Sequence, residues 1–113
     1  MGISTHVLDT SLGRPARAVP VRLERQSSPG AWQTVALSET DSDGRCRDLV
    51  PSGDPLSPGV YRITFDTGRY FAALEIEALY PVVAVTVSVR DAAAHYHIPL
   101  LLSPNGYTTY RGS

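Results

Sequence analysis

Short segments in which apolar and polar residues alternate run along the whole chain, and clusters of Pro, Gly, Ser and Asp separate them. In residues 60–66, for example, Tyr61, Ile63 and Phe65 alternate with other side chains, most of them polar. A side-chain period of two is that of a β-strand with one buried face. Many short strands between frequent turn signals predict an all-β domain, either a sandwich or a small barrel.

The pattern predicts eight strands, at residues 3–9, 19–25, 32–39, 45–49, 60–66, 82–90, 95–102 and 107–111. In the third of these strands, Val35 and Leu37 are expected to face the core. Residues 67–75 lose the period of two and gain Ala, Leu and Glu, which predicts a short helix with Thr67 as its N-cap. Residues 51–59 are rich in Pro and Gly and are expected to form a loop.

Length and charge narrow the class of protein. The 113 residues fit one domain, which we expect to span residues 1–113. Ten basic residues, all of them Arg, against eleven acidic ones give a formal net charge of -1. This balance predicts no nucleic-acid partner and no membrane-surface partner. No apolar segment is long enough to span a membrane and no secretory leader is visible, so we expect a cytoplasmic protein.

Several kinds of catalytic or metal site find no support in the sequence. A single cysteine, Cys46, excludes an internal disulfide and multi-cysteine zinc frameworks. Cys46 lies in a predicted strand between two arginines and is expected to pack as a small hydrophobe. No Gly-x-Ser-x-Gly motif marks a nucleophilic serine. Residues 41–44 (Asp-Ser-Asp-Gly) resemble the start of a calcium loop but lack the downstream Glu, so they predict a turn.

The three histidines, His6, His95 and His97, all lie in predicted strands. Regular alternation places His95 and His97 on one face of their strand, and it places His6 opposite the more apolar face of its own strand. Such a pair can bind a metal or can serve as hydrogen-bonded spacers. There is no His-Glu-x-x-His pattern and no adjacent carboxylate to orient a ligand, so we expect no metal. The remaining candidates for chemistry are His6, one of the other two histidines, and an arginine.

Four motifs together resemble the 5-hydroxyisourate hydrolases of the transthyretin-like family. They are Ser-Thr-His-Val-Leu-Asp at residues 4–9, Asp-Gly-Arg at residues 43–45, His-Tyr-His-Ile-Pro-Leu-Leu-Leu-Ser-Pro at residues 95–104, and the terminal Tyr-Arg-Gly-Ser at residues 110–113. The resemblance extends from residue 3 to residue 113. It implies a sandwich of two four-stranded sheets with one short helix, assembled as a homotetramer (a dimer of dimers) whose active sites lie at the dimer–dimer interface and need no metal or cofactor.

The resemblance also implies roles for individual residues. The catalytic positions match His6, Arg45 and His97, and the substrate-binding positions match Tyr110, Ser113 and Arg45. His95 matches a family position as well, but we expect its role to be structural.

The activity implied is the hydrolysis of 5-hydroxyisourate to 2-oxo-4-hydroxy-4-carboxy-5-ureidoimidazoline in urate catabolism. Water would add to a ring carbonyl, and the ring would open at the adjacent nitrogen. One of His6 and His97 would deprotonate the water, the other would protonate the leaving nitrogen, and Arg45 would hold the oxyanion. The sequence does not assign the two histidine roles. The alternative is a transthyretin-type small-ligand carrier without catalysis, but that protein lacks these histidines and the Tyr-Arg-Gly-Ser end.

Overall fold

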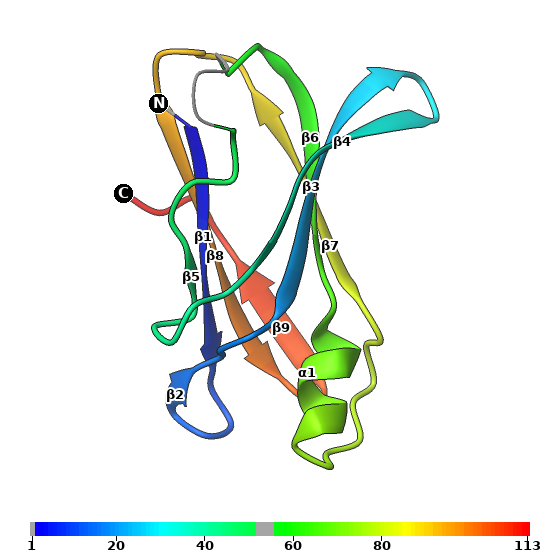
Figure 1. The fold of residues 1–113 in the computed structure, drawn as a ribbon, viewed down its shortest axis with the longest axis vertical. Coiled ribbons are helices and arrows are strands. Elements are labelled where there is room, and N and C mark those ends of the chain that lie inside the picture. The colour runs from blue at the N-terminus through cyan, green and yellow to red at the C-terminus, as the bar shows by residue number, and fades with distance from the viewer. Residues whose placement is uncertain (1, 52–55) are drawn as a thin grey trace.

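Two β-sheets, with mostly antiparallel strands, pack face to face, and one short helix lies at one end of them (Figure 1). The computed structural model describes residues 2–51 and 56–113, so part of the predicted 51–59 loop lies outside the described residues. The elements in chain order are β1 (Gly2–Asp9), β2 (Arg14–Pro15), β3 (Pro20–Ser28), β4 (Ala31–Glu39), β5 (Arg45–Cys46), β6 (Gly59–Phe65), α1 (Thr67–Ala73), β7 (Val83–Val89), β8 (His95–Ser103) and β9 (Gly106–Thr109).

The predicted sandwich is confirmed, with one difference in the strand count. One sheet has the order β4-β3-β6-β7 and contains four strands, as expected. The other has the order β2-β1-β8-β9, and β5 also pairs with β1, so it contains five. The extra strand is β2, which is only two residues long and forms between the predicted strands 3–9 and 19–25. The predicted strand 45–49 is present as β5 but covers only two residues. A two-residue strand is too short to show alternation in the sequence.

The core lies between the sheets and is filled by the alternating positions. The side chains of Tyr61, Ile63 and Phe65 are buried, as their spacing predicts. On β4 the prediction for Leu37 is wrong, since this side chain is 76% exposed. The pairing with β3 joins Leu23 to Ala36 and Glu24 to Thr34, and so skips the residue between them. This irregularity interrupts the alternation along β4, so Leu37 faces solvent while Val35 and Ala36 pack against the core.

Helix α1 forms where it was predicted, but its N-cap is one residue earlier. The carboxylate of Asp66 accepts a hydrogen bond from the backbone N–H of Arg69 at 3.2 Å. Thr67 is fully buried, and its hydroxyl donates to the carbonyl of Tyr80 at 3.1 Å. Thr67 therefore ties the helix to the segment that follows it instead of capping it. Within the described ranges, no helix is long and apolar enough to cross a membrane.

A buried hydrogen bond connects the helix to the end of β1. The Tyr70 hydroxyl donates to the carboxylate of Asp9 at 2.7 Å, and Ser11 and Leu12 donate to the other oxygen. Burial alone would raise the pKa of Asp9, but these hydrogen bonds outweigh it and the pKa lies below its ordinary value. Burial and the neighbouring Asp9 raise the pKa of Tyr70 to about 12. Asp9 is thus a buried carboxylate that depends on its donors.

Replacing Tyr70 with Phe tests this link. The change leaves one oxygen of Asp9 without its tyrosine donor, so we expect the free energy of unfolding at pH 7 to fall by about 1–3 kcal/mol. Because the pKa of Asp9 is lowered in the folded state, its stabilisation is present above pH ~4 and is lost as the pH falls through the folded-state pKa. The loss in Tyr70→Phe should therefore be smaller at pH 3 than at pH 7 in denaturant titrations.

The matched control is Tyr107→Phe, which removes a hydroxyl from a half-exposed tyrosine. This variant should keep the wild-type stability at both pH values. An equal loss for Tyr70→Phe at pH 3 and pH 7 would contradict the link to Asp9.

Candidate active site

The two ends of the chain meet in the parallel pairing of β1 with β8. The register runs without a break from Gly2 opposite His95 to Asp9 opposite Leu102. It places Ser4 opposite His97, two residues before His6. Because Ile3, Thr5 and Val7 face the core, the residues between them point to the other face of the sheet. The predicted side of β1 for His6 is therefore confirmed.

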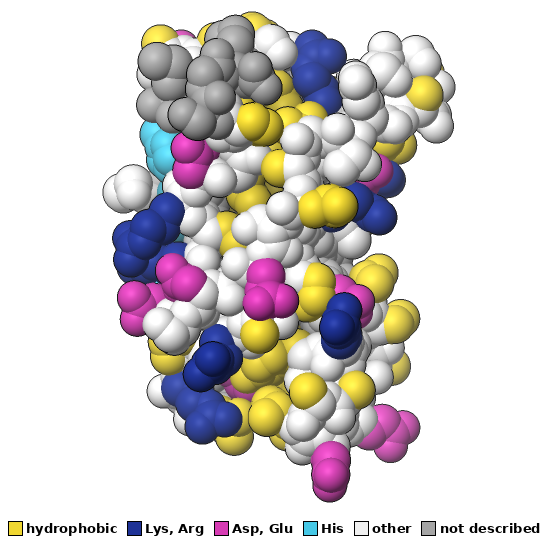
Figure 2. Space-filling model, in the orientation of Figure 1, with side chains coloured by type: hydrophobic (Ala, Val, Ile, Leu, Met, Phe, Trp, Pro, Cys, Tyr) yellow, Lys and Arg dark blue, Asp and Glu magenta, His cyan; other side chains and the backbone are white. Residues whose placement is uncertain are grey.

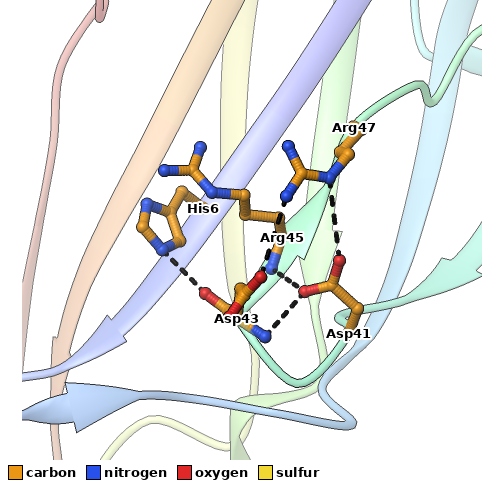
Figure 3. Close-up of polar contacts among 5 residues, drawn as sticks. All are labelled: His6, Asp41, Asp43, Arg45 and Arg47. Atoms are coloured by element: carbon orange, nitrogen blue, oxygen red, sulfur yellow. Dashed lines mark hydrogen bonds and ion pairs between the residues drawn. The ribbon is translucent and has the colours of Figure 1, made fainter.

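Arg45 reaches the same face through β5, which pairs with β1 so that Arg45 lies opposite His6. The turn before β5 sets this position. The Asp41 carboxylate accepts from the backbone N–H groups of Asp43 and Arg45, each at 2.9 Å (Figure 3). The N–H of Arg45, then that of Asp43 and the charge of Arg47, hold the pKa of Asp41 below its ordinary value. The predicted turn is confirmed, and both of its carboxylates also face Arg47 (Figure 3).

Gly44 completes this turn, and no other residue fits there. Its φ is +77°, a left-handed conformation that side chains disfavour. A Cβ at this position would lie 2.4 Å from the backbone oxygen of Val7. The backbone N–H of Val7 also donates to the Gly44 carbonyl at 2.7 Å. The glycine therefore lets the turn sit directly against β1, which brings Arg45 to His6.

The hydrogen bond of His6 defines where its proton lies. The Nε2 atom of His6 is 2.8 Å from the backbone carbonyl oxygen of Asp43 (Figure 3). A carbonyl oxygen only accepts hydrogen bonds, so Nε2 must carry a hydrogen and donate it. The other ring nitrogen, Nδ1, is therefore the one that can gain or lose a proton.

His97 is held on two sides. Its Nδ1 atom is 2.8 Å from the Ser4 hydroxyl, and its backbone carbonyl accepts from the N–H of Gly112 at 2.7 Å. Burial, followed by the charges of Arg45, His6 and His95, lowers the pKa of His97 below its ordinary value of 6.5. His97 is therefore neutral at neutral pH and has one nitrogen able to accept a proton.

Ser4 is a site residue that the sequence reasoning missed. Its hydroxyl lies 2.8 Å from Nδ1 of His97 and also 2.8 Å from Nε2 of His95. The two histidines thus share a face, as predicted, and they share a single hydroxyl between them. The available signal was strand alternation, which puts Ser4 on the same face as His6.

A small polar pocket of about 130 Å³ lies beside His97. Its lining residues are Ser4, Thr5, Arg45, Arg47 and His97. The space-filling view shows histidine side chains at the upper left edge, near the start of β1 and β8, and arginine side chains below them on the same edge (Figure 2). Ligand pockets usually enclose about 300–1,000 Å³, so this pocket within one chain is smaller than a usual small-molecule site.

The residues of the C-terminal motif, 110–113, lie in two different parts of the structure, one beside His97 and one in a separate groove. Gly112 packs on the imidazole of His97, where an added Cβ would be 2.6 Å from Cδ2. Ser113 follows directly and is exposed. Tyr110 is 55% exposed and lines a different groove, which it shares with Val85, Val87, Tyr96 and Ile98. Within one chain, the structure brings His6, Arg45 and His97 together but leaves Tyr110 apart from them.

Two alternatives from the sequence can be compared with the geometry. In residues 2–51 and 56–113, no group of three or more His, Cys, Asp or Glu side chains is arranged to hold a metal. Cys46 is 5% exposed, and burial raises the pKa of its thiol. Because the thiolate is the reactive form, this cysteine behaves as a buried hydrophobe, as predicted.

Comparisons with known proteins give the family and the fold relatives of this chain. Residues 3–112 match the model of the HIUase/Transthyretin family. The 5-hydroxyisourate hydrolase of Mus musculus is 43% identical over 112 residues, which cover 98% of this chain and 94% of the mouse protein. The structure of Klebsiella pneumoniae 5-hydroxyisourate hydrolase superposes with a TM-score of 0.87 at 36% identity, covering 100% of both chains. Sea bream transthyretin in complex with thyroxine superposes with a TM-score of 0.89 at 30% identity, covering 99% of this chain and 95% of that one.

The family model covers the histidines of β1 and β8 as well as the Asp-Gly-Arg turn, so every residue that carried the resemblance except Ser113 lies within the match. The resemblance seen in the sequence is confirmed. The chain belongs to the HIUase/Transthyretin family.

Proposed function

We propose that this protein hydrolyses 5-hydroxyisourate to 2-oxo-4-hydroxy-4-carboxy-5-ureidoimidazoline, a step of urate catabolism. The observation that carries the proposal is the meeting of His6, Arg45 and His97 on one face of the sheet, beside a polar pocket. Full-length similarity to proteins named 5-hydroxyisourate hydrolase supports it.

His97 is the base in the proposed mechanism. Its lowered pKa keeps the imidazole neutral, and Ser4 occupies Nδ1, so Nε2 is left to take a proton from water. The oxygen of that water then bonds to a ring carbonyl carbon of the substrate, and the π electrons move to the carbonyl oxygen. Arg45 lies opposite His6 in the strand pairing and supplies a cation and N–H donors for this oxyanion.

His6 is the acid in the second half of the proposed reaction. When the intermediate collapses, the C–N bond breaks and the electron pair stays on nitrogen. Protonated His6 donates from Nδ1 to that nitrogen, since its Nε2–H is held by the carbonyl of Asp43. One proton has then moved to His97 and one has left His6, so exchange with solvent restores both residues.

The proposed active form is a homotetramer, a dimer of dimers, in the cytoplasm. The pocket at His97 is small, and Tyr110 lies in a separate groove of the same chain. A second dimer packed over this face would enlarge the pocket and bring further side chains to it, so that Tyr110 and Ser113 could contact substrate. A single buried free cysteine fits a reducing compartment.

The second candidate is a small-ligand carrier of the transthyretin type, since a thyroxine-bound transthyretin has the same fold. A carrier has no need for a neutral histidine beside a second histidine and an arginine. The arrangement of these three residues therefore favours the hydrolase.

The central test measures decay of 5-hydroxyisourate, made fresh with urate oxidase, by its ultraviolet absorbance. The wild-type protein at micromolar concentration should accelerate the decay. His6→Ala, His97→Ala and Arg45→Ala should each lower the turnover number about a hundredfold or more, because each removes a proton-transfer or charge-stabilising group. Arg69→Ala, which removes an exposed arginine of α1, is the control and should keep wild-type turnover.

Sedimentation velocity on the same samples should give a tetramer for the wild type and for every variant. Decay at the spontaneous rate with the wild-type protein would refute the enzyme assignment. Loss of the tetramer together with loss of activity would assign the altered residue to assembly.

The pH dependence of kcat/KM tests the role of His97 as the base. The active form is the neutral imidazole, so activity should fall as the pH falls through the folded-state pKa of His97. Because burial and the nearby Arg45 and His6 lower that pKa, the midpoint of the acidic limb should lie below pH 6.5. An acidic limb centred above pH 6.5 would contradict this role.

A further inference from the structure

We propose that Ser4 is a positioning residue that sets the tautomer of His97. It does so within a chain of hydrogen bonds that runs from His97 through Ser4 to His95, the final acceptor. In this arrangement Nδ1–H of His97 donates to the Ser4 hydroxyl, and the hydroxyl donates its own hydrogen to Nε2 of His95. The catalytic consequence of the inference rests on the proposed function. The direction of the hydrogen bonds rests on it as well, whereas the two contacts of the Ser4 hydroxyl do not.

The geometry of the Ser4 hydroxyl carries the inference. It lies 2.8 Å from Nδ1 of His97 and 2.8 Å from Nε2 of His95, and the side chain is buried. A hydroxyl has one hydrogen to donate and can also accept. When it donates to one imidazole, it can only accept from the other. The protonation of His95 and that of His97 are therefore linked through one atom.

The direction of these hydrogen bonds follows from the proposed role of His97 as the base. With Nδ1 protonated, Nε2 of neutral His97 keeps its lone pair, and this nitrogen makes no hydrogen bond within the described part of the chain. With the opposite direction, Nε2 would carry the hydrogen and His97 could not accept a proton there. Donation from Ser4 to His95 also prevents the hydroxyl from rotating to donate to His97.

A hydroxyl also suits the electrostatics better than a carboxylate at this position. The groups that face His97 are Arg45 and Arg47 from the segment around β5, His6 from β1 and His95 from its own strand. Burial and the charges of Arg45, His6 and His95 disfavour the imidazolium form of His97. A carboxylate on Nδ1 would raise the pKa of His97, as opposite charges do, whereas neutral Ser4 orients the ring without that effect. After His97 takes a proton, its Nδ1–H bond to Ser4 becomes charge-assisted and therefore stronger.

The first test reads the tautomer directly and requires no substrate. Imidazole ¹⁵N chemical shifts of the full chain at pH 7.5 should show His97 protonated at Nδ1 and unprotonated at Nε2. Ser4→Ala should give a mixture of tautomers, and Ser4→Thr, which keeps a hydroxyl, should restore the wild-type pattern. Ser103→Ala removes a serine hydroxyl from another position of β8 and should leave the His97 signals unchanged.

The second test reads catalysis. Ser4→Ala should lower kcat about tenfold or more with little change in KM, because the ring loses its orientation but the substrate contacts remain. Ser4→Thr should recover most of this loss. His95→Ala, which removes the final acceptor, should also lower kcat, but by less than Ser4→Ala does. Denaturant titrations identify which variants are folded. If Ser4→Ala does not fold, the two single variants His95→Ala and Ser4→Thr are compared with the wild type instead.

The outcomes separate the two proposals. A wild-type protein that does not hydrolyse 5-hydroxyisourate refutes the proposed function, and the ¹⁵N result still decides the hydrogen-bond chain. The proposed hydrogen-bond chain is overturned if His97 of the wild type is protonated at Nε2. It is also overturned if the tautomer of His97 is unchanged in folded variants that lack Ser4 or His95. A shifted tautomer with unchanged kcat overturns the positioning role.

Discussion

The parallel pairing of β1 with β8 is the constraint on which the candidate site depends. It joins strands from the two ends of the sequence in one unbroken register, with Ser4 opposite His97. A shift by one residue would send every side chain of β1 to the other face of the sheet. The buried Ile3 and Val7 oppose such a shift, because it would expose them. Burial of one face of β1 thus determines what the other face presents.

Charge at the site is controlled by the turn before β5. The carboxylate of Asp41 is occupied by backbone N–H groups and, with that of Asp43, faces Arg47. The ion pairs of both carboxylates are with Arg47, while Arg45 lies opposite His6 on the face that carries His6 and His97. The same cation contributes to the lowered pKa of His97. One turn therefore positions Arg45 beside His6 and helps to keep the neighbouring His97 neutral.

Much of the fold was predictable because alternation and turn residues act locally. The strand at Tyr61 and the helix at Thr67 both appear where their patterns place them. The errors occur where contacts distant in sequence override the local pattern. The irregularity opposite Leu23 reverses the side of Leu37, and the carbonyl of Tyr80 takes the Thr67 hydroxyl away from the helix end. Neither partner can be identified from the neighbouring sequence.

The sequence by itself determined the fold class, through its period-two segments, and its motifs made His6, Arg45 and His97 the candidates for chemistry through the family resemblance. Only the tertiary structure decided how these groups are arranged and which partners hold them. It supplied the Ser4 hydroxyl between two imidazoles and the carbonyl that holds Nε2–H of His6. It also placed Tyr110 in a separate groove. The physical reason is that residue types and alternation are properties of the local chain. Hydrogen-bond partners and pKa shifts depend on strand register between distant segments.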